Sequence, residues 1–203
     1  MRLARFLLAF FKPLFFLLFP YRVTGRENIP SAEDPRPLMV CPNHISDIDP
    51  VFLLMAMKRH VYYMAKAELF QNRLAAWFVG KKFGAFPVKR GAGDTGAIDT
   101  AREIVNSGRV LGIFPEGTRS RDGKLGRAKS GAALVASQTG AYILPVAIRA
   151  RDQKVRLFRR TTLIFGEPIS PAELHLEDAE HPDLRYASRY IMDRIARMLE
   201  ESP

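Results

Sequence analysis

Residues 38–58 read LMVCPNHISDIDPVFLLMAMK, in which two apolar runs flank a polar segment. The first run, residues 38–41, has the length and the side chains of a buried strand. The second run begins at Pro50, and proline is favoured in the first turn of a helix. The stretch therefore predicts a strand that leads through the polar loop NHISDID into a helix over about residues 50–58.

The same alternation of strand and helix continues along the chain. Further apolar runs of strand length lie at residues 61–65, 85–88, 109–114, 142–148 and 161–165. Helical patterns lie between them at residues 68–82, 94–107 and 128–139, and a last amphipathic helix is expected over residues 184–199. This order is typical of an α/β fold. We expect residues 23–203 to form one domain, with a central, largely parallel (mixed) β-sheet flanked by helices.

The first 22 residues, MRLARFLLAFFKPLFFLLFPYR, are more apolar than the rest of the chain. A helix that spans a bilayer needs about 20 apolar residues. The run at residues 6–19 has only 14 residues, and Lys12 and Pro13 interrupt it. On a helix, Arg2, Arg5 and Lys12 fall on one side, as a basic stripe beside apolar residues. This pattern predicts that residues 1–22 form a short amphipathic and apolar helical membrane anchor that lies in the interface.

Two alternatives to an anchor stay open for this segment. A cleaved signal peptide also combines a basic start with an apolar run, but Pro20, Tyr21 and Arg22 do not supply the small residues of a cleavage site. The segment could instead pack against the protein's own core. The anchor interpretation predicts a monotopic or peripheral protein at the cytoplasmic face of the cell membrane.

The composition is basic, with 31 Lys and Arg against 21 Asp and Glu and a formal net charge of +10. Such a charge favours contact with nucleic acid, a phospholipid surface or a phosphorylated substrate. Nucleic-acid binding is not expected, because the sequence has neither a recognition-helix pattern nor zinc-binding Cys and His spacing. Cys41 is the only cysteine, so an internal disulfide is excluded. Since Cys41 ends an apolar strand, we expect it to be buried.

His44 and the two aspartates that follow it suggest acid–base chemistry. Pro50 disfavours a helical conformation at Asp49, so a turn can bring the Asp49 carboxylate back to His44. A carboxylate there would fix the imidazole tautomer and stabilise the imidazolium, which would make His44 a better base. The alternative is that Asp49 caps the following helix and that His44 is an ordinary loop histidine. Asp47 is expected to face solvent or to form local hydrogen bonds.

Three other predicted strands also end in polar residues. The block IFPEGTRSRDGK, residues 113–124, places Glu116 and Arg119 after one of them. Lys66 follows a second strand, and GAFPVKR, residues 84–90, ends a third with Arg90. Arginine and lysine in such positions can bind phosphate. Each block alone is also typical of a charged turn, but together they predict one site in which a base is surrounded by cations.

Taken in order, these blocks resemble those of the glycerolipid acyltransferases. NHISDID matches the His-x4-Asp motif of that family, GAFPVKR is similar to its second block, FPEGTRS to its third, and ILPVAI, residues 143–148, to its fourth. GRAKSGAALVA, residues 126–136, is similar to the stretch between the third and fourth blocks. The resemblance covers about residues 20–166. It is greatest to the bacterial-type 1-acyl-sn-glycerol-3-phosphate acyltransferases.

The resemblance implies a reaction and its catalytic residues. A fatty-acyl group would pass from acyl-CoA or acyl carrier protein to the free hydroxyl of 1-acylglycerol-3-phosphate (lysophosphatidate), which gives phosphatidic acid. His44 would be the general base, and Asp49 would orient it. The transfer would be direct, with no acyl-enzyme, no cofactor and no metal, and with the membrane surface as a further partner.

The resemblance also implies which residues bind the substrate. Glu116, Gly117, Thr118 and Arg119 would line the site of the acceptor. Lys66, Arg90 and Arg119 would neutralise its phosphate. The backbone N–H of Gly117 is a candidate donor to the oxyanion.

Three alternatives to this reaction stay open. The acceptor could be another lyso-lipid, the same His and Asp pair could use water as a lipid hydrolase does, or the protein could be a non-catalytic membrane scaffold. The segment RARDQKVRLFRR, residues 149–160, holds six basic residues in twelve. It could dock to anionic lipid or to an acidic acyl carrier protein, or it could form a solvated hairpin.

Overall fold

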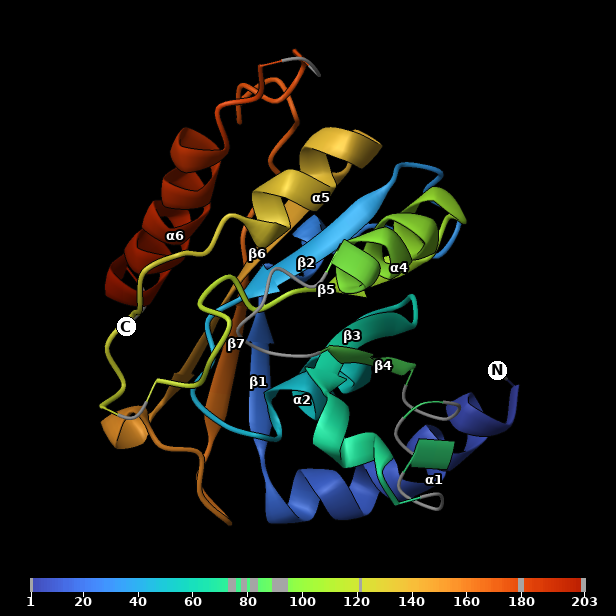
Figure 1. The fold of residues 1–203 in the computed structure, drawn as a ribbon. Helices are drawn as coiled ribbons and strands as arrows, with labels where there is room; N and C mark the ends of the chain where they lie inside the picture. Colours follow the sequence, from blue (N-terminus) through green and yellow to red (C-terminus); the bar gives the residue numbers. More distant parts are fainter. Residues whose placement is uncertain are drawn as a thin grey trace.

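The structure is a computed structural model that describes residues 2–72, 76–77, 80, 84–88, 95–120, 122–178 and 181–201. For residues 2–9, 66, 69 and 95 it describes the backbone alone. A seven-stranded sheet with the strand order β1-β7-β6-β2-β5-β3-β4 forms its centre (Figure 1). The strands are β1 (Tyr21–Thr24), β2 (Leu38–Pro42), β3 (Val61–Lys66), β4 (Ala85–Val88), β5 (Val110–Gly112), β6 (Tyr142–Ala150) and β7 (Thr161–Phe165).

The sheet is largely parallel. Strands β2 to β6 run in one direction, β7 is antiparallel to β6, and β1 is parallel to β7. The expected α/β fold with a largely parallel, mixed sheet is therefore confirmed. Strand β1 is an addition, since it begins at Tyr21 and pairs there with Thr161. The division that the sequence suggests after residue 22 falls within this strand.

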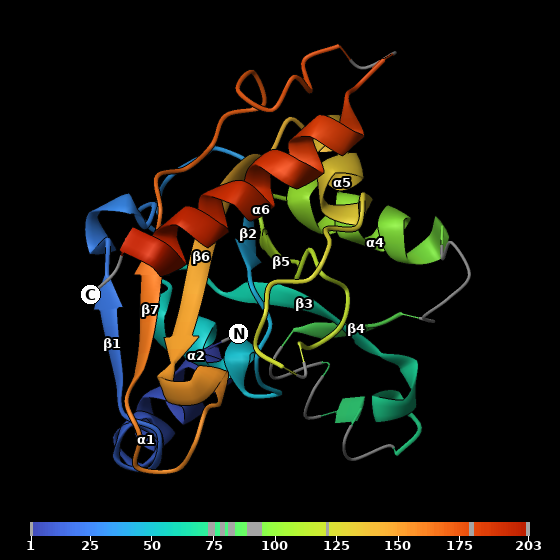
Figure 2. The same cartoon turned by 90° about the vertical axis from the view of Figure 1, so that its left-hand side faces the viewer.

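Helices cover both faces of the sheet (Figures 1 and 2). One face carries α1 (Arg2–Leu18) and α2 (Asp49–Ala56), and the other carries α4 (Thr95–Asn106), α5 (Gly131–Thr139) and α6 (Leu184–Glu201). Short 3-10 helices complete the described elements: η1 (Arg26–Asn28), η2 (Ala67–Phe70) and η4 (Arg151–Gln153).

Strand β2 shows how the two layers are held. Its side chains alternate, so that Met39 and Cys41 pack in the cluster under α4, α5 and α6, while Leu38 and Val40 pack with Phe52 of α2. All of β2 is buried, as is typical of a parallel strand covered on both faces. The loop that follows β2 therefore starts from a fixed point in the middle of the sheet.

Helix α1 packs with one side against α2. The Phe15 ring centroid lies 5.2 Å from that of Phe52, and the Lys12 ammonium donates to the Met55 carbonyl at 3.5 Å. The helix runs through Pro13, so the proline that interrupts the apolar run does not interrupt the helix. A proline removes one backbone donor, and the turns on both sides of it can stay helical when tertiary contacts hold them.

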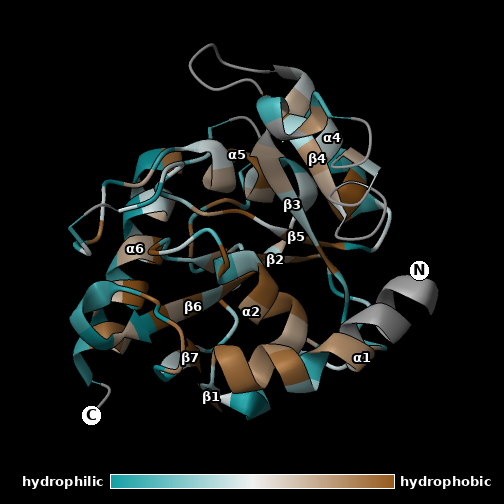
Figure 3. Ribbon diagram, turned by 90° about the horizontal axis from the view of Figure 1, so that it is seen from below, coloured by the Kyte–Doolittle hydropathy of each residue, from teal (hydrophilic) through white to brown (hydrophobic). Residues whose placement is uncertain are grey.

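The other side of α1 is exposed and apolar. Its solvent-facing side chains are 49–68% exposed and belong to Phe10, Phe11, Leu14, Phe16 and Leu17. Figure 3 shows this part of α1 largely in brown. Among the helices that the structure describes, none has the length and apolar character needed to cross a membrane.

Candidate active site

Asn43 fixes the start of the loop that follows β2. Its side chain is buried, donates to the Ile148 carbonyl at 3.0 Å and accepts from the Ile148 N–H at 2.6 Å. Strand β6 extends beyond the end of β2, so the backbone groups of Ile148 have no strand partner on that side and need another. The Asn43 amide supplies it, which ties the loop to the centre of the sheet.

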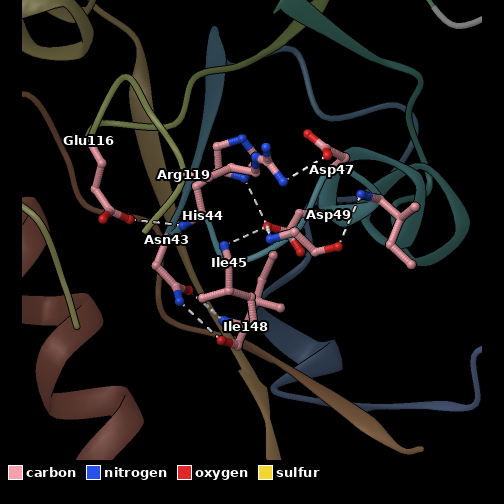
Figure 4. A network of polar contacts seen from close by, with 10 residues as sticks. Asn43, His44, Ile45, Asp47, Asp49, Glu116, Arg119 and Ile148 are labelled. Carbon is pink, nitrogen blue, oxygen red and sulfur yellow. Dashed lines mark hydrogen bonds and ion pairs between the residues drawn. The ribbon is translucent and has the colours of Figure 1, made fainter. Parts of the chain in front are cut away.

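The loop then turns back on itself and brings Asp49 to His44 (Figure 4). The Asp49 Oδ2 atom lies 2.9 Å from His44 Nδ1 and accepts from the N–H groups of Ile45 and Ser46 at 2.8 Å each. Asp49 is fully buried. The turn that the sequence suggests, from the effect of Pro50, is the one that forms.

The alternative role of Asp49 as a helix cap is wrong. The first N–H groups of α2, those of Val51 and Phe52, donate to the Ile48 carbonyl at 2.9 and 3.2 Å. The Asp49 carboxylate points away from them, into the preceding loop, because three N–H donors converge on it there. Asp49 therefore lies in the first turn of α2, but its carboxylate binds His44 and does not cap the helix.

These contacts define the tautomer of His44. The Asp49 Oδ2 atom accepts from two backbone N–H groups, so it carries no proton of its own and Nδ1 of His44 is the donor between them. Nε2 is then left with a free lone pair, as a general base requires. Burial raises the pKa of the Asp49 carboxyl, while the hydrogen bonds from His44 and from the loop N–H groups act in the opposite direction.

An aromatic ring holds the imidazole from the side. The ring centroids of His44 and Phe114 are 3.9 Å apart at an interplanar angle of 27°, and Tyr63 stacks behind Phe114 at 6.2 Å. The His44 side chain is only 12% exposed. The Ser120 N–H donates to the His44 carbonyl at 2.9 Å. The ring therefore has one orientation, with little access for solvent.

Glu116 joins two loops to the loop that carries His44. It is 5% exposed, and its Oε1 accepts from the His44 N–H at 2.9 Å while Oε2 accepts from the Gly126 N–H at 2.8 Å. Both oxygens thus face backbone groups of the protein. The sequence resemblance suggests that Glu116 lines the acceptor site, whereas in this geometry its carboxylate positions the backbone of the base.

Gly117 does not offer a free N–H. It donates to the Phe114 carbonyl at 2.9 Å, which closes a tight turn over residues 114–117, and its φ of +68° suits glycine. The suggestion that this N–H binds the oxyanion is therefore wrong, because the turn already uses it. A Cβ atom at Gly117 would lie 2.8 Å from Cδ and 3.1 Å from Nζ of Lys129.

Lys129 is thus a site residue that the sequence reasoning missed. Its ammonium lies over the Gly117 turn, and the Lys129 N–H donates to the Pro115 carbonyl at 2.8 Å. The signal was present, since Lys129 lies within GRAKSGAALVA, the stretch that resembles the region between the third and fourth blocks of the family. Nothing in the sequence alone links it to the turn at residues 114–117.

Arg119 and Thr118 lie at the outer rim of the site. Arg119 Nη1 contacts Asp47 Oδ2 at 2.7 Å, with the two side chains 50% and 76% exposed, and Thr118 is exposed as well. Asp47 thus faces solvent, as expected, but its ion pair joins it to a residue of a different loop. An exposed pair of this kind contributes about 0–1 kcal/mol, so the guanidinium can exchange partners at little cost.

Two predicted site residues can be placed only in part. Lys66 is the last residue of β3, and its side chain lies outside the described atoms; Arg90 follows β4 and lies outside the described residues altogether. Strands β2, β5, β3 and β4 are neighbours in this order and run parallel, so their carboxyl ends share one edge of the sheet (Figure 1). The expected meeting of four strand ends is therefore present in the backbone.

Other catalytic chemistry finds no support in the described part of the chain. Cys41 is buried, and burial raises the pKa of its thiol to about 12, so it is not a thiolate nucleophile. Within the described residues, no group of three or more His, Cys, Asp and Glu side chains could hold a metal ion.

Comparison with known proteins identifies the family. The acyltransferase family model matches residues 20–149, which include the His44 loop, the Glu116 turn and most of β6. The chain belongs to the acyltransferase family. Over 164 residues it is 34% identical to a 1-acyl-sn-glycerol-3-phosphate acyltransferase of Bacillus subtilis, which covers 78% of this chain and 79% of the relative.

Two further relatives of this acyltransferase are informative. The crystal structure of the 1-acyl-sn-glycerophosphate acyltransferase PlsC from Thermotoga maritima is similar with a TM-score of 0.75 and 26% identity, over 98% of this chain and 79% of that one. A lyso-ornithine lipid O-acyltransferase of Pseudomonas aeruginosa is 33% identical over 62% of this chain and 48% of the relative.

Proposed function

We propose that the protein transfers a fatty-acyl group from an acyl thioester, either acyl-CoA or acyl carrier protein, to the free hydroxyl of 1-acyl-sn-glycerol-3-phosphate. The product is phosphatidic acid. The names of the relatives support this acceptor. The observation that carries the mechanism is the buried 2.9 Å contact between His44 Nδ1 and Asp49 Oδ2, which leaves Nε2 as a base.

In the proposed mechanism, Nε2 of His44 takes the proton from the acceptor hydroxyl as its oxygen attacks the thioester carbonyl. A C–O bond forms and a tetrahedral oxyanion results. The C–S bond then breaks, and the proton on Nε2 passes to the thiolate that leaves. Acid–base help of this kind accelerates reactions by about 10² to 10⁴-fold. Asp49 keeps Nδ1 protonated and stabilises the transient imidazolium.

The rim of the site supplies the charge that a phosphate needs. Among the residues that the structure describes, Arg119 pairs there with an exposed aspartate, and Lys129 lies over the neighbouring Gly117 turn. In the proposed complex the phosphate replaces Asp47 as the partner of Arg119, with Lys66 and Arg90 as further cations. Guanidinium and phosphate pair with two parallel hydrogen bonds, which also fixes the orientation of the acceptor.

We propose that α1 attaches this enzyme to the membrane, at its cytoplasmic face. The exposed apolar side chains of α1 support a helix that lies in the interface. Helix α1 also contacts α2 directly, through Phe15 and Lys12, and α2 begins with Asp49. Helix α2 therefore connects the lipid-facing helix α1 to the catalytic pair. This arrangement supports direct entry of a lipid acceptor from the membrane, without passage through water.

A second candidate acceptor is a lyso-lipid with another head group. The similarity to the lyso-ornithine lipid O-acyltransferase favours it, because the name of that relative gives a lyso-ornithine lipid as the acceptor. A lipid hydrolase or a non-catalytic scaffold has weaker support. Water needs no cluster of cations, and a scaffold needs no buried carboxylate that holds a histidine, since burial of a charge is unfavourable.

The proposal is tested with purified full-length protein in lipid–detergent micelles. Lysophosphatidate, a lyso-ornithine lipid and no acceptor are compared, each with a long-chain acyl-CoA and with an acylated carrier protein. Thiol release and lipid product are followed together. Phosphatidic acid in step with thiol release supports the proposal. Release of thiol or fatty acid without a new lipid favours the hydrolase. Product from the lyso-ornithine lipid alone means that this lipid, and not lysophosphatidate, is the acceptor. No turnover with any pair of substrates favours the scaffold.

A further inference from the structure

We propose that residues 154–160, here called the arginine loop, form a second membrane contact that docks onto an anionic phospholipid bilayer beside α1. This inference rests on the membrane attachment proposed above. It adds a contact from a segment that lies far along the chain from α1, directly before β7.

The arginine loop exposes large apolar side chains. Leu157 is 54% exposed and Phe158 is 66% exposed. Of the exposed large apolar side chains in the described part of the protein, five lie on α1, two are these, and the remaining one is Trp77. Apolar exposure is therefore concentrated on two elements. A cluster of this kind marks a surface that another phase or molecule covers.

The topology of the sheet brings these two elements together. Strands β1 and β7 are parallel and in register from Tyr21 and Thr161, so the segments that precede them meet at one end of the sheet. The Phe158 N–H donates to the Leu18 carbonyl at 2.7 Å, and the Thr161 N–H donates to the Pro20 carbonyl at 2.9 Å. Figures 1 and 2 show the end of α1 and the chain before β7 side by side at the bottom of the molecule.

The backbone of Phe158 is strained. Its φ is +58°, a region that side chains larger than glycine rarely adopt. Two backbone hydrogen bonds hold this conformation, from the Phe158 N–H to the Leu18 carbonyl at 2.7 Å and from the Arg159 N–H to the Arg156 carbonyl at 3.2 Å, but the Phe158 ring is exposed and packs in neither core cluster. Strain in an exposed aromatic residue is accounted for when the ring is buried on binding. Insertion into lipid would bury Phe158 and Leu157 together with the exposed side of α1.

The charges around the apolar pair fit anionic lipid. Arg156, Arg159 and Arg160 flank Leu157 and Phe158, and all three are exposed. Guanidinium groups at the level of phosphate head groups, with an apolar tip below them, are the arrangement of an interfacial segment. A bilayer can cover α1 and the loop at the same time. An acidic carrier protein would match the arginines but would not account for the exposed apolar side chains of the loop and of the neighbouring α1.

The test is binding of the full-length protein to vesicles, measured by flotation. Phosphatidylcholine vesicles are compared with vesicles that contain phosphatidylglycerol as well. One variant combines Leu157→Ser with Phe158→Gly, which relieves the strain, and a second combines Arg156→Gln, Arg159→Gln and Arg160→Gln. We expect each to weaken binding to anionic vesicles about tenfold or more. The matched control, Arg185→Gln, Arg189→Gln and Arg197→Gln, removes three exposed arginines of α6 and is expected to bind as the wild type does.

The outcomes separate this inference from the membrane attachment by α1. If wild type floats with no vesicle, both fail. If Leu14→Ser with Leu17→Ser loses binding while both loop variants float like wild type, the loop contact alone is overturned. Two other outcomes also overturn it: a loop variant that loses turnover with carrier-protein donor but keeps vesicle binding, or wild type that self-associates through the loop. Unchanged turnover of the loop variants in micelles confirms that they fold.

Discussion

Two neighbouring aspartates, Asp47 and Asp49, have opposite surroundings within one loop. Asp49 is fully buried and accepts from three N–H groups, whereas the Asp47 side chain is 76% exposed and contacts only Arg119 among the residues described. The difference separates two tasks. The base needs a fixed partner before substrate arrives, while the phosphate-binding cation needs a partner that it can leave. One loop thus holds a rigid inner part and an exchangeable outer part.

The largest difference in the rate of acyl transfer is expected between Asp49→Asn and Asp47→Asn. The first keeps the shape of the side chain but lets Nδ1 of His44 lose its acceptor, so acyl transfer should fall about 10²-fold or more, because the wrong tautomer is then available. The second should change kcat less than about threefold. Steady-state rates of both variants, with thiol release as the signal, measure this. Equal losses in the two variants would remove the distinction between inner and outer part.

Glu116→Gln should have the next largest effect. The side-chain NH2 group of glutamine cannot accept, so the N–H of either His44 or Gly126 loses its partner. A buried unsatisfied donor lowers the free energy of unfolding by about 1–3 kcal/mol. We expect kcat to fall about tenfold with little change in KM, because the base moves and the acceptor site does not. Glu167→Gln, at an exposed position, is the matched control. A rise in KM for the acceptor without loss of kcat would mean that Glu116 binds substrate.

Arg119→Ala tests whether the exposed partner of Asp47 binds the phosphate of the acceptor. Loss of a charge-assisted contact to phosphate corresponds to about 1.5–3 kcal/mol, so KM for the acceptor should rise about tenfold or more. Stability should change by less than about 1 kcal/mol, since the Asp47 pair is exposed. Kinetics at varied acceptor concentration and urea unfolding measure the two quantities. A fall in kcat at constant KM would place Arg119 with the base.

The pH dependence of stability should reveal the burial of Asp49. Burial raises the pKa of Asp49 above its ordinary value of 3.8, so the folded protein holds this proton more tightly than the unfolded chain does. The contribution of Asp49 to stability is then greatest below about pH 3.8 and falls as pH rises through the raised pKa.

Melting temperatures of wild type and Asp49→Asn between pH 3.5 and 7 test this sign. Asp49→Asn cannot ionise, so its melting temperature relative to wild type should rise with pH. A relative fall of Asp49→Asn as pH rises would mean that the three hydrogen bonds outweigh burial and that the pKa is lowered.

Tyr63→Phe should have the smallest effect. The Tyr63 hydroxyl is buried and has no hydrogen-bond partner within the described part of the chain, and burial near Asp49 raises its pKa well above the ordinary value. Removal of an unsatisfied hydroxyl should leave the free energy of unfolding unchanged or raise it by about 1 kcal/mol. Chemical denaturation measures this. Destabilisation with loss of activity would show that the hydroxyl takes part in holding Asp49, whose buried Oδ1 also has no partner among the residues described.

The sequence predicts the sheet well where strands are continuous apolar runs. The expected strands at residues 61–65, 85–88 and 161–165 agree with β3, β4 and β7 within one residue. Strand β1 has only the four residues YRVT and follows the apolar anchor segment, so it gives no separate signal. Residues 167–182 look like a polar loop, yet Ile169 and Leu174 are buried. Their burial depends on β6 and α6, which local sequence does not specify.

In the candidate site, too, the sequence indicates local contacts but not contacts between loops that are distant along the chain. The pairing of His44 with Asp49 is a local contact that the effect of Pro50 makes possible. Local geometry alone leaves it open beside the helix-cap alternative, and the family resemblance implies it. The contacts of Glu116 depend on Gly126, and those of Gly117 on Lys129, which lie ten or more residues away. Residue types at a strand end indicate that a site is present. Which oxygen faces the substrate and which faces the backbone depends on the three-dimensional arrangement of several loops.

The most direct test of the catalytic base is a comparison of His44→Ala with His181→Ala. The His181 side chain is exposed, and this residue lies far along the chain from the residues of the site. Both variants receive a radiolabelled acyl thioester and lysophosphatidate in micelles, and labelled phosphatidic acid and free thiol are measured together. The account predicts that His44→Ala loses about 10²-fold or more of both products in parallel, while His181→Ala matches wild type. A His44→Ala variant that still forms phosphatidic acid at the wild-type rate would contradict the assignment of the buried pair as the catalytic base.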